Sequence, residues 1–559
     1  MTTISRFTGD RRKDPPATAL GRAAGRLPEW ARLPLAVGLA CEFVLLLWWL
    51  AFYPGLMSFD SVTYVWQVTT DNWQSDHSVL YDTAVWLSLQ LTGGLAALTF
   101  LQTVAMSAAL AYTATGLRAL GARGRWAAAA ALACVIVPST GTFSIFVWKD
   151  SAYAISAVFA FGAITHLTAR ADWARRVARK APRKAATAKP EAGPGAGPGA
   201  GSGGGPVGVG AHPWRPDAHW WVLAAGMLGL SLFRNNGYPA VVAAGLVLVI
   251  AMPRQWRRIG IVTLGPTALA LALNFGVYPA AGIKEPSTSS YYAFNYADIS
   301  VAYNRAPGDF RRSDLTVMAQ VAPLSHWSRA GANCQWVDPV LAPPFNRPAA
   351  ERLNDKLLTV WRHTFTKRPD LIISGHLCRS RIAWALPHRD SDIYVQPPVI
   401  PADAFGQAAP GGRMEHSRYL PELRLDPPSA RLHRAGVWAY TAARAPELLW
   451  PLWTGSLWCW ATYLMVFRVV RRRRLRAAVA LAAITVGLQL AVIAANPSGL
   501  FRYMAALVLL GVLMLPLLGA AGRESRRPTE RATPKRVAAE PAPAVPERVA
   551  LDEPPPAPA

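Results

Sequence analysis

Apolar stretches recur along this chain, and polar or basic segments separate them. Many of them are long enough to cross a hydrocarbon core of about 30 Å as helices. Several are short or contain Pro and Gly, which a membrane helix tolerates where its neighbours satisfy the freed backbone groups. The pattern predicts an all-α polytopic membrane protein with about ten transmembrane helices, near 33–52, 94–117, 126–143, 151–169, 219–234, 237–252, 258–281, 448–470, 476–495 and 500–520.

The Lys and Arg residues of the short loops predict the orientation, because cytoplasmic loops carry an excess of both. The N-terminal tail (1–32) is basic, whereas the loop 53–93 contains Asp but no Lys or Arg. We therefore expect a multi-pass protein of the cell membrane with both termini in the cytoplasm. The loop 53–93 is then external. The remaining basic segments then fall inside: 118–125, 170–218, 253–258, 471–476 and the tail 521–559.

Residues 79–117 present a conflict between hydropathy and charge. They are apolar enough for two crossings, but two crossings would place the basic segment 118–125 outside. We therefore predict that about 79–92 form a helix lying on the outer surface of the membrane. A second interfacial helix is predicted at 435–447.

Composition divides the rest of the chain into folded and disordered parts. The linker 170–218 and the tail 521–559 are rich in Ala, Gly or Pro and are predicted to be disordered and cytoplasmic. The segment 282–447 is polar, yet it has apolar residues at helical spacing and is too long for a connector. We predict a partly helical external domain there, between an N-terminal transmembrane module (33–281) and C-terminal helices (448–520).

Charge and cysteine content narrow the classes of function. The net charge is +25, but the basic residues lie between apolar runs, which is typical of a membrane protein and not of a nucleic-acid binder. No phosphate-binding Gly loop, dinucleotide fingerprint or metal-ligand spacing is present, so we expect no nucleotide cofactor and no metal site. Cys334 and Cys378 share the external segment and could pair in an oxidising compartment, although sequence does not reveal their geometry.

The first external loop is the most informative region for chemistry. It begins with the sequence YPGLMSFDS (53–61), so that Asp60 follows a predicted membrane helix by a few residues. An acid there is costly to desolvate and is often functional, as a general base for example. Alternatively, Asp60 simply caps a helix. Asp76 and His77 form either a site pair or a solvated turn.

These residues carry a resemblance to a known superfamily. Asp76, His77, Leu80 and Tyr81 form an Asp-His-x-x-Leu-Tyr string that resembles the GT-C membrane glycosyltransferases, which include protein O-mannosyltransferases and bacterial aminoarabinose transferases. Ser78-Val79 stand where Pro-Pro is more usual. The Pro-Gly-x-x-Ser-x-Asp-Ser motif at 54–61 is more closely similar to a poorly characterised bacterial membrane family assigned to that superfamily. The resemblance covers 33–281 and the last helices, and none of 282–447.

The resemblance implies roles for further residues. Asp150 matches the placement of an acidic residue in the second external loop, unless it only follows a Trp-Lys interfacial anchor. Arg234, at a polar break between two apolar runs, would bind the phosphate of a lipid donor, and Asn235 would contact the sugar or close an Asn-Gly turn. Arg502 would be a second phosphate ligand beside Tyr503, or would snorkel to the interface.

The predicted function follows from this resemblance. The chain is expected to have a GT-C-like helical bundle and to move a sugar from a polyprenyl-phosphate donor to a cell-envelope acceptor on the extracytoplasmic face. Asp60 would be the catalytic base, and Asp76, His77 and Asp150 would shape the site or bind the acceptor. The alternatives are a transporter or flippase, which would also contain intramembrane charges and broken helices, and a scaffold without catalysis.

Overall fold

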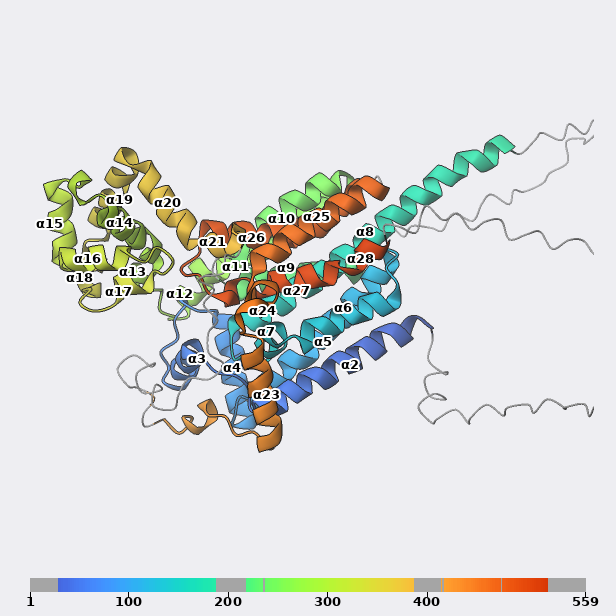
Figure 1. The fold of residues 1–559 in the computed structure, drawn as a ribbon, viewed down its shortest axis with the longest axis horizontal. Coiled ribbons are helices and arrows are strands. Elements are labelled where there is room, and N and C mark those ends of the chain that lie inside the picture. The colour runs from blue at the N-terminus through green and yellow to red at the C-terminus, as the bar shows by residue number, and fades with distance from the viewer. Residues whose placement is uncertain are drawn as a thin grey trace, which may run out of the picture.

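The computed structural model describes residues 29–187, 218–234, 237–386, 414, 417–473 and 475–520. Throughout these residues the secondary structure is helical, and only three isolated β-bridges occur. Long helices run along one axis of the molecule, and a separate group of shorter helices covers one end of them (Figure 1). We call this end the domain end and the opposite one the basic end.

The long helices form a bundle with a buried centre and exposed flanks. Helix α8 is central, because 78% of its apolar 18-residue stretch is buried inside the protein. Helix α2 is peripheral, because only 22% of the corresponding stretch is buried. Small residues permit close packing, since Gly116 of α5 lies against Thr165 of α8. The bundle contains α2 (Glu29–Ala51), α5 (Ala96–Ala119), α6 (Gly124–Ile136), α8 (Lys149–Thr187), α9 (Ala218–Leu232), α10 (Gly237–Ala251), α11 (Trp256–Ala272), α25 (Gly455–Arg473), α26 (Ala483–Ala494), α27 (Ala505–Met514) and α28 (Pro516–Ala520).

The helical membrane-type fold agrees with the prediction. By length and composition, five described helical segments could span a membrane: Ala31–Ala51, Ala96–Ala119, Lys149–Arg175, Pro253–Ala280 and Arg476–Ala494. The pair Gly124–Ile136 and Pro138–Ile145, bent by 72°, is either a sixth, broken span or a re-entrant loop. Helices α9, α10 and the segment Ala505–Gly519 are apolar but shorter. The count of about ten crossings therefore stays a prediction.

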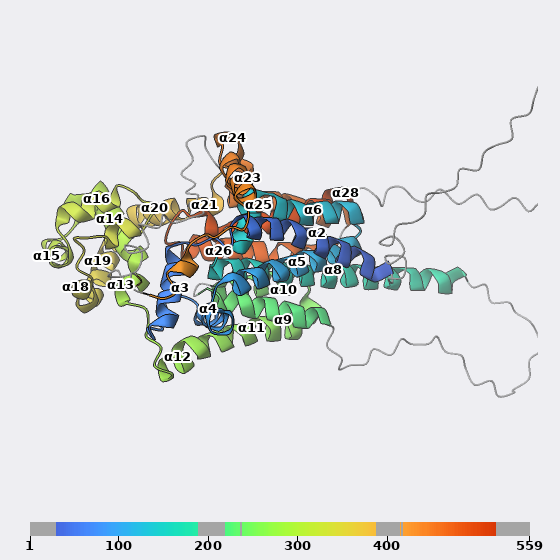
Figure 2. The same cartoon turned by 90° about the horizontal axis from the view of Figure 1, so that it is seen from below.

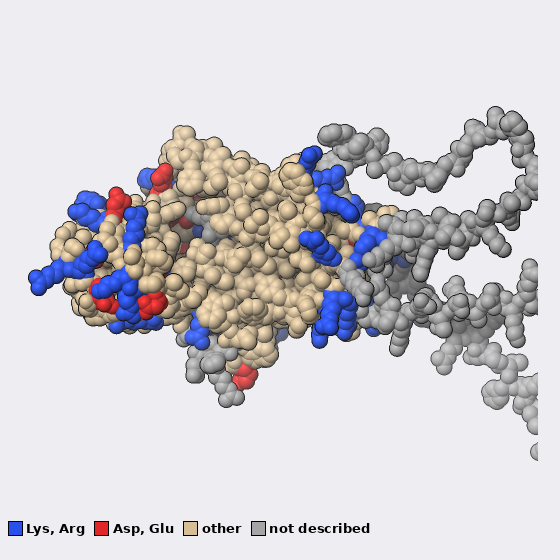
Figure 3. Space-filling view, turned by 90° about the horizontal axis from the view of Figure 1, so that it is seen from above, with Lys and Arg blue, Asp and Glu red and all other residues tan. Residues whose placement is uncertain are grey.

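The distribution of charge along the bundle fits the expected orientation. On the face shown in Figure 3, a broad area almost without charged side chains crosses the middle of the molecule, Lys and Arg line the basic end, and basic and acidic side chains are mixed at the domain end. The α5–α6 connection, which contains the basic segment 118–125, lies at that end (Figure 1). The ends of the described chain, α2 and α28, also lie there. The cytoplasmic location of the termini stays a prediction.

Four helices near the domain end lie across the bundle: α3 (Phe59–Thr69), α4 (Val79–Thr92), α23 (Ala430–Ala442) and α24 (Pro446–Trp453). Helix α4 is upright in Figure 1 and is seen along its axis in Figure 2, so it runs across the long helices. It is capped by the Ser78 side chain, which accepts a hydrogen bond from the Tyr81 N–H, and it ends at Gly93 in a left-handed conformation. The predicted helix at 79–92 is confirmed.

One boundary of the predicted organisation is wrong. The linker 170–218 was expected to be disordered, but α8 continues as a helix to Thr187. Ala, Arg and Lys dominate this stretch, and all three are good helix formers. The rest of the linker, 188–217, and the tail 521–559 lie outside the described residues.

Residues 288–379, within the segment predicted to lie outside, fold into a helical domain with its own core, which we call the external domain after that prediction. Trp327, Tyr296 and Met318 are among its most buried side chains. Cys334 and Cys378 form a disulfide, with their Cα atoms 5.9 Å apart. The domain contains α13 (Thr288–Tyr291), α14 (Ala293–Arg305), α15 (Arg312–Val321), α16 (Leu324–Gly331), α17 (Asp338–Leu341), α18 (Arg347–Arg352), α19 (Asn354–Lys367) and α20 (Pro369–Arg379), and α21 (Arg381–Trp384) leads back to the bundle.

Candidate functional site

Two loops at the domain end are joined through their backbones. The Leu56 N–H donates to the Ile145 carbonyl at 3.0 Å, and the Val147 N–H donates to the Leu56 carbonyl at 2.9 Å. The Ser61 hydroxyl adds a bond to the Val147 carbonyl at 2.8 Å. These bonds place the start of α3 beside the start of α8. The second residue of each helix is an aspartate, and the two aspartates consequently face one site.

The structure explains the glycine of the Pro-Gly motif, which lies where these two loops meet. Gly55 has φ +144°, a conformation that residues with a side chain rarely adopt. A Cβ atom there would also lie 2.9 Å from the Ile145 carbonyl oxygen. Glycine therefore allows the loop before Asp60 to approach the loop before Asp150.

Each of the two aspartates forms an ion pair with an arginine from a distant part of the chain. Arg502, in the short 3-10 helix Phe501–Tyr503, donates to Asp60. Arg234, at the break between α9 and α10, donates to Asp150. The four charges that the sequence singled out thus form two acid–arginine pairs.

Tyr503 connects the two pairs. The Arg234 Cζ lies 4.6 Å from the centroid of the Tyr503 ring, and the Arg502 Cζ lies 5.2 Å from it. Arg502 also donates a hydrogen bond to the Tyr503 hydroxyl at 3.2 Å. Both guanidinium groups are therefore stabilised by one aromatic ring, which holds them close to each other.

A third polar group contains Asp76, His77 and Lys149. The Lys149 Nζ donates to the His77 Nδ1 at 2.8 Å, and the His77 backbone N–H donates to the Asp76 carboxylate at 2.9 Å. Gln67 donates to the same carboxylate oxygen at 3.0 Å. Sequence reasoning took Lys149 for an interfacial anchor and missed its place in the site. Its position directly before Asp150 is the signal that could have identified it.

These groups line one cavity of about 580 Å³. All but one of the predicted site residues line it: Asp60, Asp76, His77, Asp150, Arg234, Arg502 and Tyr503. Asn235 lies outside the described residues. Leu271, Asn274 and Phe275 contribute a wall from the α11 end of the bundle. A polar and aromatic wall, which the sequence did not predict, comes from the start of the external domain: Glu285, Thr288, Ser290, Tyr291, Tyr292 and Phe294.

Electrostatics fix the protonation states of two of these groups. Burial by itself raises the pKa of Asp60, but the nearby cations, Arg502 above all, lower it to about 2. Burial, together with Lys149, lowers the pKa of His77 to about 4. At neutral pH, Asp60 is therefore a carboxylate and His77 is neutral, with Nδ1 accepting from Lys149.

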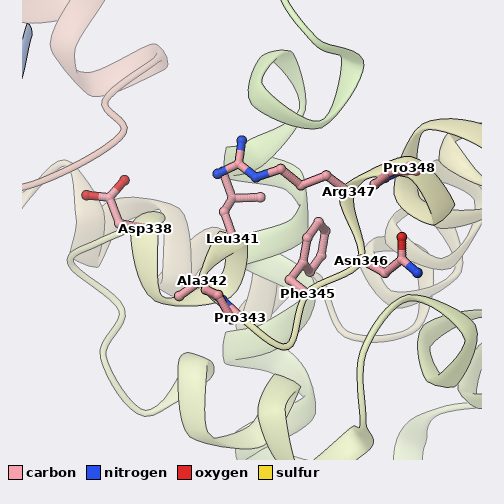
Figure 4. Close-up of a pocket in the computed structure, with 8 residues that line it drawn as sticks. All are labelled: Asp338, Leu341, Ala342, Pro343, Phe345, Asn346, Arg347 and Pro348. Atoms are coloured by element: carbon pink, nitrogen blue, oxygen red, sulfur yellow. The ribbon is translucent and has the colours of Figure 1, made fainter. Parts of the chain in front are cut away.

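Two other observations bear on ligands. Among the described residues, no three His, Cys, Asp or Glu side chains are grouped so as to hold a metal ion. The external domain has a second pocket, of about 500 Å³, at the turn between α17 and α18 (Figure 4). Leu341, Phe345 and Arg347 line it, and Asp338 lies at its edge with its carboxylate pointing away from Phe345. None of the predicted site residues lies there.

Comparison with known proteins gives one partial family match and no activity. Residues 63–341 match the profile of a family of unknown function (DUF6020). The matched segment includes Asp76, His77, Asp150 and Arg234, whereas Asp60 lies before it and Arg502 after it. No curated protein matches the chain, and no solved structure does.

Proposed function

We propose that this protein is an inverting glycosyltransferase of the GT-C type, which moves a sugar from a polyprenyl phosphate to an acceptor on the extracytoplasmic face of the cell membrane. The observation that carries the proposal is the convergence of two arginines, each paired with an aspartate, in one cavity. That cavity lies where the apolar bundle meets the external domain.

The two arginines suit the phosphate of a lipid donor. A guanidinium group stays charged and donates paired hydrogen bonds to phosphate oxygens. Arg234 and Arg502 share Tyr503, so one anion can contact both. Leu271 and Phe275 line the same cavity, and Phe275 is 70% exposed at the bundle surface. The cavity thus combines an anion site with an apolar surface that a prenyl chain would contact.

Asp60 is the proposed catalytic base. Its carboxylate takes the proton of an acceptor hydroxyl as the hydroxyl oxygen bonds to the anomeric carbon. The bond between that carbon and the phosphate oxygen breaks, and its electron pair leaves with the phosphate. Arg234 and Arg502 stabilise the charge that develops there. When the phosphate binds Arg502, Asp60 loses part of the interaction that holds its pKa near 2. Donor binding therefore increases the basicity of Asp60.

The remaining groups would position the acceptor. Asp76, His77 and Lys149 form a hydrogen-bonded group beside Asp60. Thr288, Ser290 and the Tyr291 ring, all from the external domain, offer hydroxyls and an aromatic face of the kind that sugars contact. We propose that the external domain selects the acceptor through this wall. The donor is lipid-linked, so no cytosolic nucleotide is needed at the site.

The test is sugar transfer by the full chain in lipid nanodiscs. The donors are polyprenyl-phosphate monosaccharides carrying a radiolabelled hexose or pentose, and the products are envelope glycolipids or, without acceptor, free sugar. Wild-type protein is expected to release labelled sugar from at least one donor, and Asp60→Asn is expected to abolish this release.

The same material distinguishes the transporter alternative. The protein is reconstituted in liposomes, and the transbilayer movement of a labelled polyprenyl phosphate is followed. Movement of the lipid without release of sugar from any donor would contradict the transferase and support a flippase.

A further inference from the structure

The segment that carries Arg502 is held from outside the bundle. Residues 493–503, which we call the arginine segment, join α26 to α27 and end with Arg502 and Tyr503. In the structure, the external domain contacts the arginine segment along two separate stretches.

The first stretch is a short backbone pairing with residues 335–337. The Gly499 N–H donates to the Gln335 carbonyl at 3.1 Å, and the Val337 N–H donates to the Pro497 carbonyl at 3.0 Å. Trp336 and Ser498 form an isolated antiparallel bridge between these bonds. The pairing fixes the backbone three residues before Arg502.

The second stretch is the end of α20. The Asn496 side-chain amide donates to the Arg379 carbonyl at 2.8 Å, and His376 Nε2 donates to the Ile493 carbonyl at 2.8 Å. Asn496 and Arg379 are both almost fully buried. Arg379 in turn donates to the buried Asp298 of α14, which anchors this contact within the domain.

A covalent bond joins these two stretches. Cys334 directly precedes Gln335, and its disulfide partner Cys378 directly precedes Arg379. The disulfide therefore links the two parts of the domain that hold the arginine segment, although 44 residues separate them in sequence. The domain core around Trp327 and Tyr296 does not contain either cysteine.

We propose that Asn496 and the Cys334–Cys378 disulfide are positioning elements for Arg502, so that the external domain sets the affinity of the site for phosphate. The proposal rests on the proposed function, since it assigns Arg502 to the phosphate. With the disulfide reduced, the two stretches separate more easily and Arg502 samples positions away from Asp60 and Tyr503. Anion affinity then depends on the redox state of a bond that does not contact the ligand.

The test uses the full chain in nanodiscs with farnesyl phosphate as the probe. Asn496→Ala and the double variant Cys334→Ser/Cys378→Ser are each expected to raise its Kd at least tenfold. Asn354→Ala is the matched control, because Asn354 accepts a buried hydrogen bond from Tyr296 at 2.7 Å inside the same domain but does not touch the arginine segment. Its Kd is expected to equal that of the wild type.

A second readout separates positioning from general destabilisation. The three variants are repeated in an Arg502→Ala background, where Asn496→Ala and the cysteine variant are expected to have no further effect on Kd. Equal weakening in both backgrounds would overturn the proposal. Hydrogen exchange is expected to accelerate in the arginine segment of the cysteine variant while α15 and α19 stay protected. Unchanged exchange in the arginine segment would also overturn it.

Failure of the proposed function gives a different result. If Arg502→Ala alone leaves the farnesyl phosphate Kd unchanged, phosphate does not bind at Arg502 and the proposed function fails. Hydrogen exchange does not depend on the ligand, so it still decides whether the disulfide and Asn496 restrain the arginine segment.

Discussion

The two acid–arginine pairs of the cavity have the same chemistry but different surroundings. The Asp60 side chain is 20% exposed and that of Arg502 is 16% exposed, whereas Asp150 is 2% exposed and Arg234 is 11% exposed. Ring contacts do not distinguish the two arginines, since Arg234 lies over Tyr153 and Tyr503 and Arg502 lies over Trp148 and Tyr503. The first pair is therefore the more accessible from the cavity, and the difference is largest between the two aspartates.

This difference assigns different tasks to the two aspartates. A base must reach the proton that it takes, and only Asp60 has that access. Asp150 is too enclosed to meet an acceptor directly, but it neutralises Arg234 and fixes its position. A buried pair is costly to break, because the remaining charge has no solvent to replace its partner. Asp60 should thus matter most for turnover and Asp150 most for stability.

The largest expected effect is on turnover. Asp60→Asn should reduce sugar transfer by about 10²–10⁴-fold, the usual contribution of a general base, because an amide cannot take the acceptor proton. Thermal stability should fall less than in Asp150→Ala, since Asn keeps the shape of Asp and the ion pair with Arg502 that it loses is the more exposed one. Initial rates of label transfer measure the effect, and Asp71→Asn, in the same loop but outside the cavity, is the control. A variant that keeps more than a third of wild-type turnover would remove Asp60 as the base.

The next effect is on folding. Asp150→Ala should lower the free energy of unfolding by about 3–5 kcal/mol, because Arg234 is left buried and unpaired. Asp60→Ala, in the more exposed pair, should cost clearly less. Denaturant unfolding in detergent micelles compares the two variants, and Asp150→Ala/Arg234→Met should recover much of the loss. Equal costs for the two single variants would show that the pairs do not differ as their exposure indicates.

A smaller effect is the pH dependence of folding stability, which we expect from His77, next to the Asp60–Arg502 pair. Its pKa is about 4 in the folded protein and near 6.5 when unfolded, so the unfolded state binds the extra proton between these values. Its contribution to stability is intact above pH 6.5 and is lost as the pH falls toward 4. At pH 5 the loss is about 2 kcal/mol, at 1.36 kcal/mol per pKa unit.

His77→Gln isolates this contribution from the other histidines. Thermal unfolding is measured from pH 7 to pH 5 for the wild type and the variant. The wild type should lose more stability than His77→Gln over this interval. Parallel curves for the two proteins would mean that His77 is not held neutral.

The smallest expected effect separates charge from shape at the arginines. Arg502→Lys keeps the positive charge but loses the planar fork of donors, so the Kd for farnesyl phosphate should rise about tenfold, or about 1.4 kcal/mol. Arg234→Lys should weaken binding more, since Arg234 belongs to the less exposed pair and has less solvent to replace the lost donors. Isothermal titration in nanodiscs ranks the two variants. A stronger effect at Arg502 would reverse the proposed contrast between the pairs.

Much of this organisation was accessible from local sequence patterns. The three arginines of 118–125 were sufficient to place 79–92 across the bundle, since loop charge decides between alternatives that hydropathy leaves open. Four site residues could be selected from the sequence because a charged side chain beside an apolar run is costly to desolvate and is often functional. They are Asp60, Asp150, Arg234 and Arg502. Seven of the eight predicted site residues line the same cavity, and Asn235 lies outside the described residues.

The rest depends on contacts that leave no local signal. Nothing in the sequence shows which arginine pairs with which aspartate, because both pairs join distant segments. The wall at 285–294 comes from a domain without a recognised motif, and its tyrosines resemble ordinary packing residues. Lys149 was left out of the predicted site because a Trp-Lys pair next to an apolar run is a common anchor at membrane interfaces. The start of the linker 170–218 was wrongly predicted to be disordered, because that prediction rested on the composition of the whole linker. Its first part, up to Thr187, consists mainly of good helix formers.

The span between Asp60 and its partner has a consequence for how the protein is made. Arg502 follows Asp60 by 442 residues, so the ribosome completes almost the whole chain before the pair can form. Synthesis proceeds from the N-terminus, and Asp60 therefore emerges long before its cation, as does the external domain before the arginine segment that it holds. A chain that stalls before the last helices has neither Arg502 nor Tyr503. Synthesis of the segment that carries Arg502 is thus the step that makes the site complete, and a product that ends before this segment lacks the site.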